Sequence, residues 1–238
     1  MQAKSVSLKL FAAVALTGIT SVASAVDFDV AIDNVSRGLF FTPLAVGAHP
    51  AGTSLFSVGG AASAELQAMA EGGDISGLEI MLTGIGATMS NNPAAGLLLP
   101  GQGATASLNT DNAADNTQLS IVAMILPSND GFVALNAIDI PTEAGTYTFF
   151  ANAYDAGTEA NDELRGSGAP GEAGFPVPPP LDPMLGTGGT GVNASAEGFV
   201  HIHRGSLGDA DAASGTSDID MTVQRWLNPV AKITITVR

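Results

Sequence analysis

The amino-acid sequence predicts an all-β domain, either a sandwich or a barrel. Short apolar segments recur along the chain, and turns separate them, since the sequence holds 29 glycines and 13 prolines. Several segments alternate apolar and polar residues, which is the pattern of a half-buried strand. Only one short segment shows clear helical spacing, so we expect strands to supply most of the core.

The expected strands are distributed over the whole chain. Asp27–Val35 (DFDVAIDNV) places Phe28, Val30 and Ile32 on one face and acidic residues on the other. Gln118–Leu126 (QLSIVAMIL) is a continuous apolar run, as expected for a strand that is buried on both faces. The other expected strands are Leu78–Met89, Ala104–Leu108, Gly131–Ile140, Gly145–Tyr154, Phe199–His203 and Val230–Val237.

Ser63–Glu71 (SAELQAMAE) is the segment predicted to form a short helix. Ser63 can cap its first turn, and Glu65 lies where the helix dipole favours a negative charge. Gly72 and Gly73 follow directly and end the helical pattern.

Long loops rich in glycine and proline are expected at residues 90–103 and 157–197. The second loop contains Gly186, Gly188 and Gly191 at the GxGxxG spacing of dinucleotide-binding folds. That fingerprint needs a strand before it and a helix after it, and the sequence predicts neither. We therefore interpret these glycines as loop residues.

The amino terminus has the pattern of a secretory signal. Lys4 and Lys9 flank the start of an apolar core, and Ala23 to Ala25 supply the small residues of a cleavage site. The apolar run is shorter than the roughly 20 residues that a membrane-spanning helix needs. We therefore expect a signal peptide at 1–25, one domain at 26–238, no membrane span, and a periplasmic or extracellular location.

Charge and composition narrow the range of partners. The chain has 23 acidic residues against 8 lysines and arginines, and its net charge is −15 at pH 7. Such a surface repels nucleic acid and anionic lipid and attracts cations. The chain has no cysteine, so we expect stability to come from the core and a bound ion and not from disulfides.

The sequence contains none of the common catalytic motifs that we considered. GxSxG, HExxH, a Walker loop and a cysteine nucleophile are all missing. A Ser/His/Asp triad assembles only in the fold, so a hydrolase stays an open hypothesis without a local signature to support it. We expect a binding module and not an enzyme.

The three histidines are candidate ligands of a transition metal. His201 and His203 lie two residues apart in FVHIHR, and in a strand this spacing places both rings on one face. His49, in an earlier loop, would add a third nitrogen, and imidazole suits copper, zinc or nickel. The alternative is a solvent-facing pair beside Arg204. HxH with a distant histidine also resembles surface copper-binding proteins of methane-oxidising bacteria.

Acidic residues after two expected strands are candidate ligands of Ca²⁺. Asp130 ends LPSND, and Asp155 and Glu159 lie in AYDAGTEANDE. If these strand ends meet at one rim, their carboxylates supply the oxygen ligands that Ca²⁺ prefers, and the ion relieves their repulsion. The alternative is a solvated acidic loop. That second interpretation also applies to a group of acids without EF-hand spacing, Asp209, Asp211, Asp218 and Asp220.

The motifs around these acids resemble the spondin amino-terminal domain, or F-spondin domain, in its bacterial form. LPSNDGFVALNAIDIP followed by TYTFFANAYDAGTEANDE is the most specific part of the resemblance. FTPLAVGAHPAG, SAELQAMAEGGD, GFVHIHRG and NPVAKITI extend it from about Asp27 to Arg238. The resemblance implies a C2-like antiparallel β-sandwich with a bound Ca²⁺ near one end. Animal members are extracellular-matrix and adhesion proteins.

The resemblance also implies which residues hold the ion. Asp130 matches the aspartate after the LPS run, and Asp155 and Glu159 match the two acidic positions of a YDAGTD-like motif. Glu159 is one methylene longer than the aspartate of that motif. Animal members carry further repeats and cysteines, so their adhesion partners are not transferred to this chain.

Together these patterns predict an exported metal-binding module. The leading expectation is a structural Ca²⁺ at Asp130, Asp155 and Glu159, in a domain that binds a surface protein or a polysaccharide. The alternative is acquisition or storage of copper or another transition metal by the three histidines. The two sites do not exclude each other.

Overall fold

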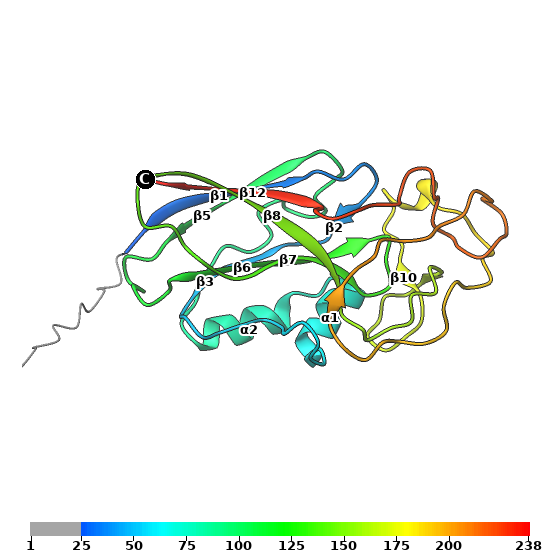
Figure 1. Cartoon of the computed structure of the whole chain (residues 1–238), viewed down its shortest axis with the longest axis horizontal. Helices are drawn as coiled ribbons and strands as arrows, with labels where there is room; N and C mark the ends of the chain where they lie inside the picture. Colours follow the sequence, from blue (N-terminus) through cyan, green and yellow to red (C-terminus); the bar gives the residue numbers. More distant parts are fainter. Residues whose placement is uncertain (1–24) are drawn as a thin grey trace, which may run out of the picture.

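The computed structural model describes residues 25–238 and confirms an all-β sandwich (Figure 1). The predicted signal peptide lies almost entirely outside the described residues. Within the described part of the chain, no helix is long and apolar enough to cross a membrane. The strands of the main sheet are β1 (Asp27–Asn34), β2 (Phe40–Phe41), β3 (Ala45–His49), β4 (Thr88–Met89), β5 (Gly103–Asn109), β6 (Gln118–Leu126), β7 (Gly131–Asp139), β8 (Gly145–Asp155), β11 (His201–Ile202) and β12 (Ala231–Val237).

One long antiparallel sheet folds over itself to make both layers. Its order is β4-β3-β6-β7-β8-β12-β1-β5, and β2 and β11 pair with β6 and β8 at the side of this path. Two short strands, β9 (Arg165–Gly166) and β10 (Phe175–Pro176), form a separate parallel pair. A short 3₁₀ helix, η1 (Asp182–Met184), follows in the same long loop region.

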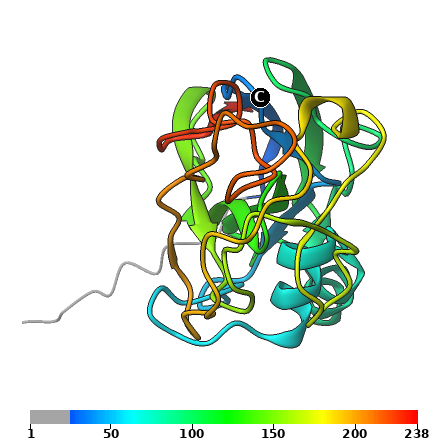
Figure 2. The ribbon, with the colours of Figure 1, turned by 90° about the vertical axis from the view of Figure 1, so that its right-hand side faces the viewer.

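Strand β8 belongs to both layers. Its residues 145–151 pair with β12, whereas residues 152–155 pair with β7. Figure 1 shows β8 crossing from the layer of β1, β5 and β12 to the layer of β3, β6 and β7. Its last residue, Asp155, therefore lies at the end of the sandwich where the long loops gather, the end that faces the viewer in Figure 2.

Two apolar clusters fill the domain. The first lies between the layers and includes Phe28, Val30 and Ile32, the face of β1 that the alternation predicts. The second lies between the sheet and the two helices. Alternate residues of β6 enter the two clusters, with Leu119 in the first and Val122 in the second. This arrangement explains why the β6 sequence is apolar without a break.

The predicted helix forms as α1 (Ala64–Gly72). Ser63 caps it, because the backbone N–H of Leu66 donates to the Ser63 hydroxyl at 3.1 Å. Gly73 follows with a φ of 71°, a left-handed conformation that glycine adopts without strain.

The prediction of a strand at Leu78–Met89 is wrong. The segment forms a second helix, α2 (Ser76–Gly84), and then the two-residue strand β4. Leu78 and Leu82 are fully buried, whereas Ile80 between them is 75% exposed. The buried residues therefore have the helical spacing of four and not the strand period of two. The sequence does not reveal this spacing, because most residues of the segment are apolar.

Strand β3 is an element that the sequence analysis missed. All five of its residues are buried, so its sequence, AVGAH, has no alternation of apolar and polar residues. His49 is consequently the last residue of a buried strand and not a loop residue.

Phe132 provides a test of the second cluster. It is fully buried, and its ring lies 5.1 Å from the ring of Phe56 and 5.6 Å from that of Tyr154. Phe132→Ala should lower the free energy of unfolding by ~3–5 kcal/mol through lost burial and a residual cavity. Urea unfolding measures the loss. Phe150→Ala, at a phenylalanine of β8 that is 59% exposed, is the matched control and should change stability by less than about 0.5 kcal/mol. Equal losses would contradict the assigned core.

Candidate metal centre

Three strand ends meet at the loop-rich end of the sandwich. Asp155 ends β8, and it pairs with Gly131, the first residue of β7, on one side and with His201, the first residue of β11, on the other. Asp130 directly precedes β7. The register of the sheet thus brings together residues that are far apart in the sequence.

Asp155 lies between two imidazoles. Its Oδ1 is 3.5 Å from His201 Nε2, and its Oδ2 is 3.8 Å from His203 Nε2. Both rings are on the face of β11 that Asp155 occupies on β8, as the period of two predicts. The carboxylate is 1% exposed, and it accepts hydrogen bonds from Gly157 N and Asn161 Nδ2, each at 2.8 Å.

Glu197 joins this group. One ligand atom each from Asp155, Glu197 and His201 lie within 4.8 Å of one another. The Asn161 amide donates to Asp155 Oδ2 at 2.8 Å and to Glu197 Oε1 at 3.4 Å, so one side chain orients both carboxylates. The sequence analysis missed Glu197 because it lies in a loop. An acid four residues before His201, in EGFVHIH, is the signal that was available.

The loop that carries Glu197 is held against the end of β8. Gly198 N donates to Gly157 O at 2.8 Å. Gly157 has a φ of 68°, and a Cβ at this position would lie 2.3 Å from Phe199 O. Only glycine permits this close approach, so Gly157 helps to place Glu197 and His201 beside Asp155.

The two imidazoles present different nitrogens. His201 Nδ1 lies 3.0 Å from Ile202 O, so Nδ1 carries the proton and Nε2 offers its lone pair to the centre. His203 Nδ1 accepts from Gly205 N at 3.0 Å, which places the proton of the neutral ring on Nε2. Burial lowers the pKa of His203 to about 4. His201 therefore has the tautomer of a metal ligand, and His203 has the other one.

Most of the buried side-chain polar atoms that lack a hydrogen-bond partner lie at this rim. Residues 25–238 contain six such side-chain atoms, which are Asp130 Oδ1, Glu159 Oε2, Glu197 Oε2, His201 Nε2, His203 Nε2 and Trp226 Nε1. The Trp226 ring packs against that of His203 at a centroid distance of 4.9 Å. Each unsatisfied buried group costs about 1–3 kcal/mol, so their concentration at one place indicates a site for a ligand.

Asp130 lies close to Asp155 but outside the three-residue group. Its Oδ2 accepts from the backbone N–H groups of Thr158 at 2.7 Å and Glu159 at 3.1 Å, while Oδ1 has no partner. Burial and the negative charge of Asp155 raise the pKa of Asp130 to about 7. The carboxyl group therefore resists ionisation in the folded protein.

The Glu159 side chain is engaged elsewhere. Its Oε1 accepts from Asn129 Nδ2 at 2.6 Å and from Gly174 N at 2.5 Å, and burial raises its pKa. Of the predicted calcium ligands, the structure brings Asp130 and Asp155 together. Glu159 does not belong to the group of ligand atoms within 4.8 Å, and Glu197 does.

The expectation that His49 joins the other histidines is wrong. His49 pairs with Gln118, which pairs with Asp139 at the far end of β7, eight strand positions from Gly131. At ~3.3 Å per residue, that separation is roughly 26 Å. The ring is fully buried, and its nitrogens face Ser120 Oγ at 2.8 Å and Pro50 O at 3.1 Å. His49 has a structural role in this strand.

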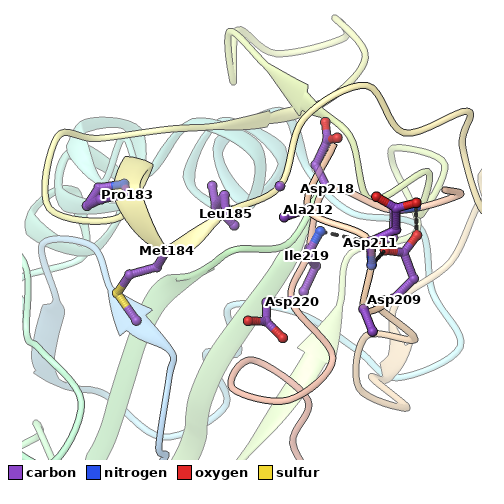
Figure 3. A pocket seen from close by; sticks show the side chains of 12 residues that line it. Pro183, Met184, Leu185, Asp209, Asp211, Ala212, Asp218, Ile219 and Asp220 are labelled. Carbon is purple, nitrogen blue, oxygen red and sulfur yellow. Dashed lines mark hydrogen bonds between the residues drawn. The ribbon is translucent and has the colours of Figure 1, made fainter. Parts of the chain in front are cut away.

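The second group of acids forms the wall of another pocket (Figure 3). Asp209 accepts from Asp211 N, Thr216 N and Ser217 N, and these backbone hydrogen bonds lower its pKa. Asp218 is buried and accepts from Arg165 N and Gly189 N. These carboxylates hold the loop backbone, so they differ from the unsatisfied carboxylates of the metal centre.

Comparison with known proteins identifies the family. A search of curated proteins gave no significant match. The family model described as Spondin_N matches residues 35–166, a segment that includes Asp130, Asp155 and Glu159. Glu197, His201 and His203 lie beyond its end. Because the match covers more than half of the sequence, the chain belongs to the spondin amino-terminal domain family.

Proposed function

We propose that this protein is an exported metal-binding module whose main site consists of Asp155, Glu197 and His201. The observation that carries the proposal is the convergence of one ligand atom from each residue within 4.8 Å. His201 Nε2 and Glu197 Oε2 are buried without a hydrogen-bond partner, and a cation would satisfy both. The amino-terminal signal pattern and the family, whose members are typically secreted, support a periplasmic or extracellular location.

The donor set favours a transition metal. Ca²⁺ is normally surrounded by six to eight oxygen atoms, whereas imidazole nitrogen suits zinc, copper and nickel. Two carboxylates and one neutral imidazole would balance the charge of a divalent ion. The site supports the metal-handling hypothesis, with two carboxylates in place of the second and third histidines.

Metal titration of the mature chain tests the main site. We expect isothermal titration with Zn²⁺ to give one equivalent bound. His201→Ala and Glu197→Gln should each weaken binding by at least ~100-fold, because each removes a direct ligand. His49→Gln keeps a polar side chain beside Ser120 and serves as the control, with unchanged affinity. Zn²⁺ affinity that survives both ligand substitutions would disprove the site.

A substitution of His203 tests whether the metal has one histidine ligand, as proposed, or two. Its Nδ1 accepts from Gly205 N, so His203 is expected to support Asp155 and not to bind the ion. His203→Gln should therefore weaken Zn²⁺ binding by ~10-fold, the lower end of the range for supporting residues. A loss as large as that of His201→Ala in the same titration would show that both rings are ligands.

A second candidate function is a structural Ca²⁺ beside Asp130, in a scaffold that binds a surface protein or a polysaccharide. The specific support is Asp130 Oδ1, which is buried without a partner next to the carboxylate of Asp155. Burial, and then repulsion from Asp155, raise the pKa of Asp130, and an ion there would offset both effects. The family resemblance also supports a calcium site near this strand end.

The pH dependence of stability tests this candidate. The pKa of Asp130 is raised from 3.8 to about 7 by folding. Below both pKa values, Asp130 is protonated in both states and does not affect stability. Between the two values, the free energy of unfolding falls as pH rises, because the unfolded state ionises first. Above pH 7 the full loss of stability is present. Without metal, Asp130→Asn should therefore raise the Tm at pH 8 and leave it nearly unchanged at pH 4.

Ca²⁺ should reverse the difference in Tm between the natural protein and Asp130→Asn at pH 8. Millimolar Ca²⁺ at pH 8 is expected to raise the Tm of the natural protein and to have no such effect on the Asp130→Asn variant. Thermal unfolding with and without EDTA measures both. An equal effect of Ca²⁺ on the two proteins would eliminate Asp130 as a ligand.

A further inference from the structure

A small cavity borders the metal centre on a side that Glu197 does not line. Its volume is about 50 Å³. On the same scale one water molecule requires roughly 10–15 Å³, so the cavity has room for a carboxylate group but not for a large ligand. The residues of its wall that matter for the argument are Asp155, Asn161, Glu163, His201, His203 and Arg204.

A bound divalent metal would neutralise the two carboxylates that otherwise repel an anion from this cavity. Asp155 and Glu197 together offset the charge of a divalent ion. Glu163 is also present, but its oxygens accept from Leu207 N at 2.5 Å, Gly208 N at 2.8 Å and Ser217 Oγ at 2.6 Å. Its negative charge is therefore stabilised by three donors within the loop.

Arg204 supplies a positive charge that has no ion-pair partner among the described residues. Among residues 25–238, Arg165, Lys232 and Arg238 form ion pairs with aspartates, whereas Arg204 forms none. It lines the same cavity as Asp155, His201 and His203. A guanidinium group binds carboxylates through two parallel hydrogen bonds and remains charged at any physiological pH.

We propose that the metal at Asp155, Glu197 and His201 keeps one coordination position open to this cavity, and that an external carboxylate binds there with the help of Arg204. The inference rests on the proposed metal site. Three protein ligands with one open position is a common arrangement for zinc. The carboxylate is either a small free acid or the Asp or Glu side chain of a partner protein. The site would then bind its partner through the metal.

Cobalt absorption provides the test, because the visible spectrum of Co²⁺ responds to its ligands. The mature chain is loaded with Co²⁺, the bound stoichiometry is measured, and acetate is added at constant ionic strength. We expect a saturable spectral change with acetate and none with acetamide, which has the same shape without the charge. A short peptide with one aspartate is titrated in parallel. A spectral change with this peptide shows that the side chain of a partner protein can enter the site. A change with acetate but not with the peptide shows that the ligand is a small free acid.

Arg204→Gln is the decisive variant. It should take up Co²⁺ normally and bind acetate at least ~10-fold more weakly, because it loses a charged hydrogen-bond donor. Arg37→Gln removes the same charge at another exposed arginine, which lines a different pocket, and should bind acetate like the natural protein. Such a pair of results distinguishes a local contact from a change in net charge.

The outcomes separate this inference from the metal proposal. If the chain takes up no Co²⁺ or Zn²⁺, both are overturned. If Co²⁺ binds and acetate leaves its spectrum unchanged, the metal site stands and the open position is disproved. If Arg204→Gln binds acetate as tightly as Arg37→Gln, the assigned role of Arg204 is wrong.

Discussion

The antiparallel pairing at the carboxyl end of β8 is the constraint on which the site depends. Asp155 is in register with Gly131 on one side and His201 on the other. A shift of one residue would turn Asp155 to the opposite face and separate it from both imidazoles. The register is held further along the strand, where residues 145–151 of β8 pair with β12. The sandwich therefore fixes the position of the candidate ligands, although the loops supply part of them.

The acidic residues of this protein serve two different purposes, which the net charge alone does not reveal. Glu163, Asp209 and Asp218 are used as acceptors for backbone N–H groups, and they hold together loops that have little regular structure. Asp130 and Glu197 each keep a buried oxygen without a donor. In a long loop region with few apolar residues, carboxylates of the first kind replace part of a core. Those of the second kind make folding costly unless a cation is bound.

Local patterns in the sequence predicted most strands and part of the site. The alternation in β1 and the unbroken apolar run of β6 follow from which faces are buried, and the two histidines of FVHIHR share a face for the same reason. The errors arise where contacts between residues far apart in the sequence determine the local structure. Leu78 and Leu82 are buried by α1 and β3, and no local alternation marks the buried strand that ends in His49. Glu197 reaches Asp155 only because Gly157 lets the loop approach β8, a contact that no periodicity reveals.

The residues of the candidate metal centre come from two parts of the chain with different structural demands. Asp155 lies in the sheet and inside the segment that defines the family, whereas Glu197 and His201 lie beyond that segment. Of residues 197–203, Val200 alone belongs to an apolar cluster, the one between the sheet and the helices. In the proposed metal site, this separation would let the donor atoms of the loop change independently of the carboxylate that the sheet presents. Substitutions in one loop can exchange nitrogen for oxygen donors while the sandwich, and the carboxylate it presents, stay as they are.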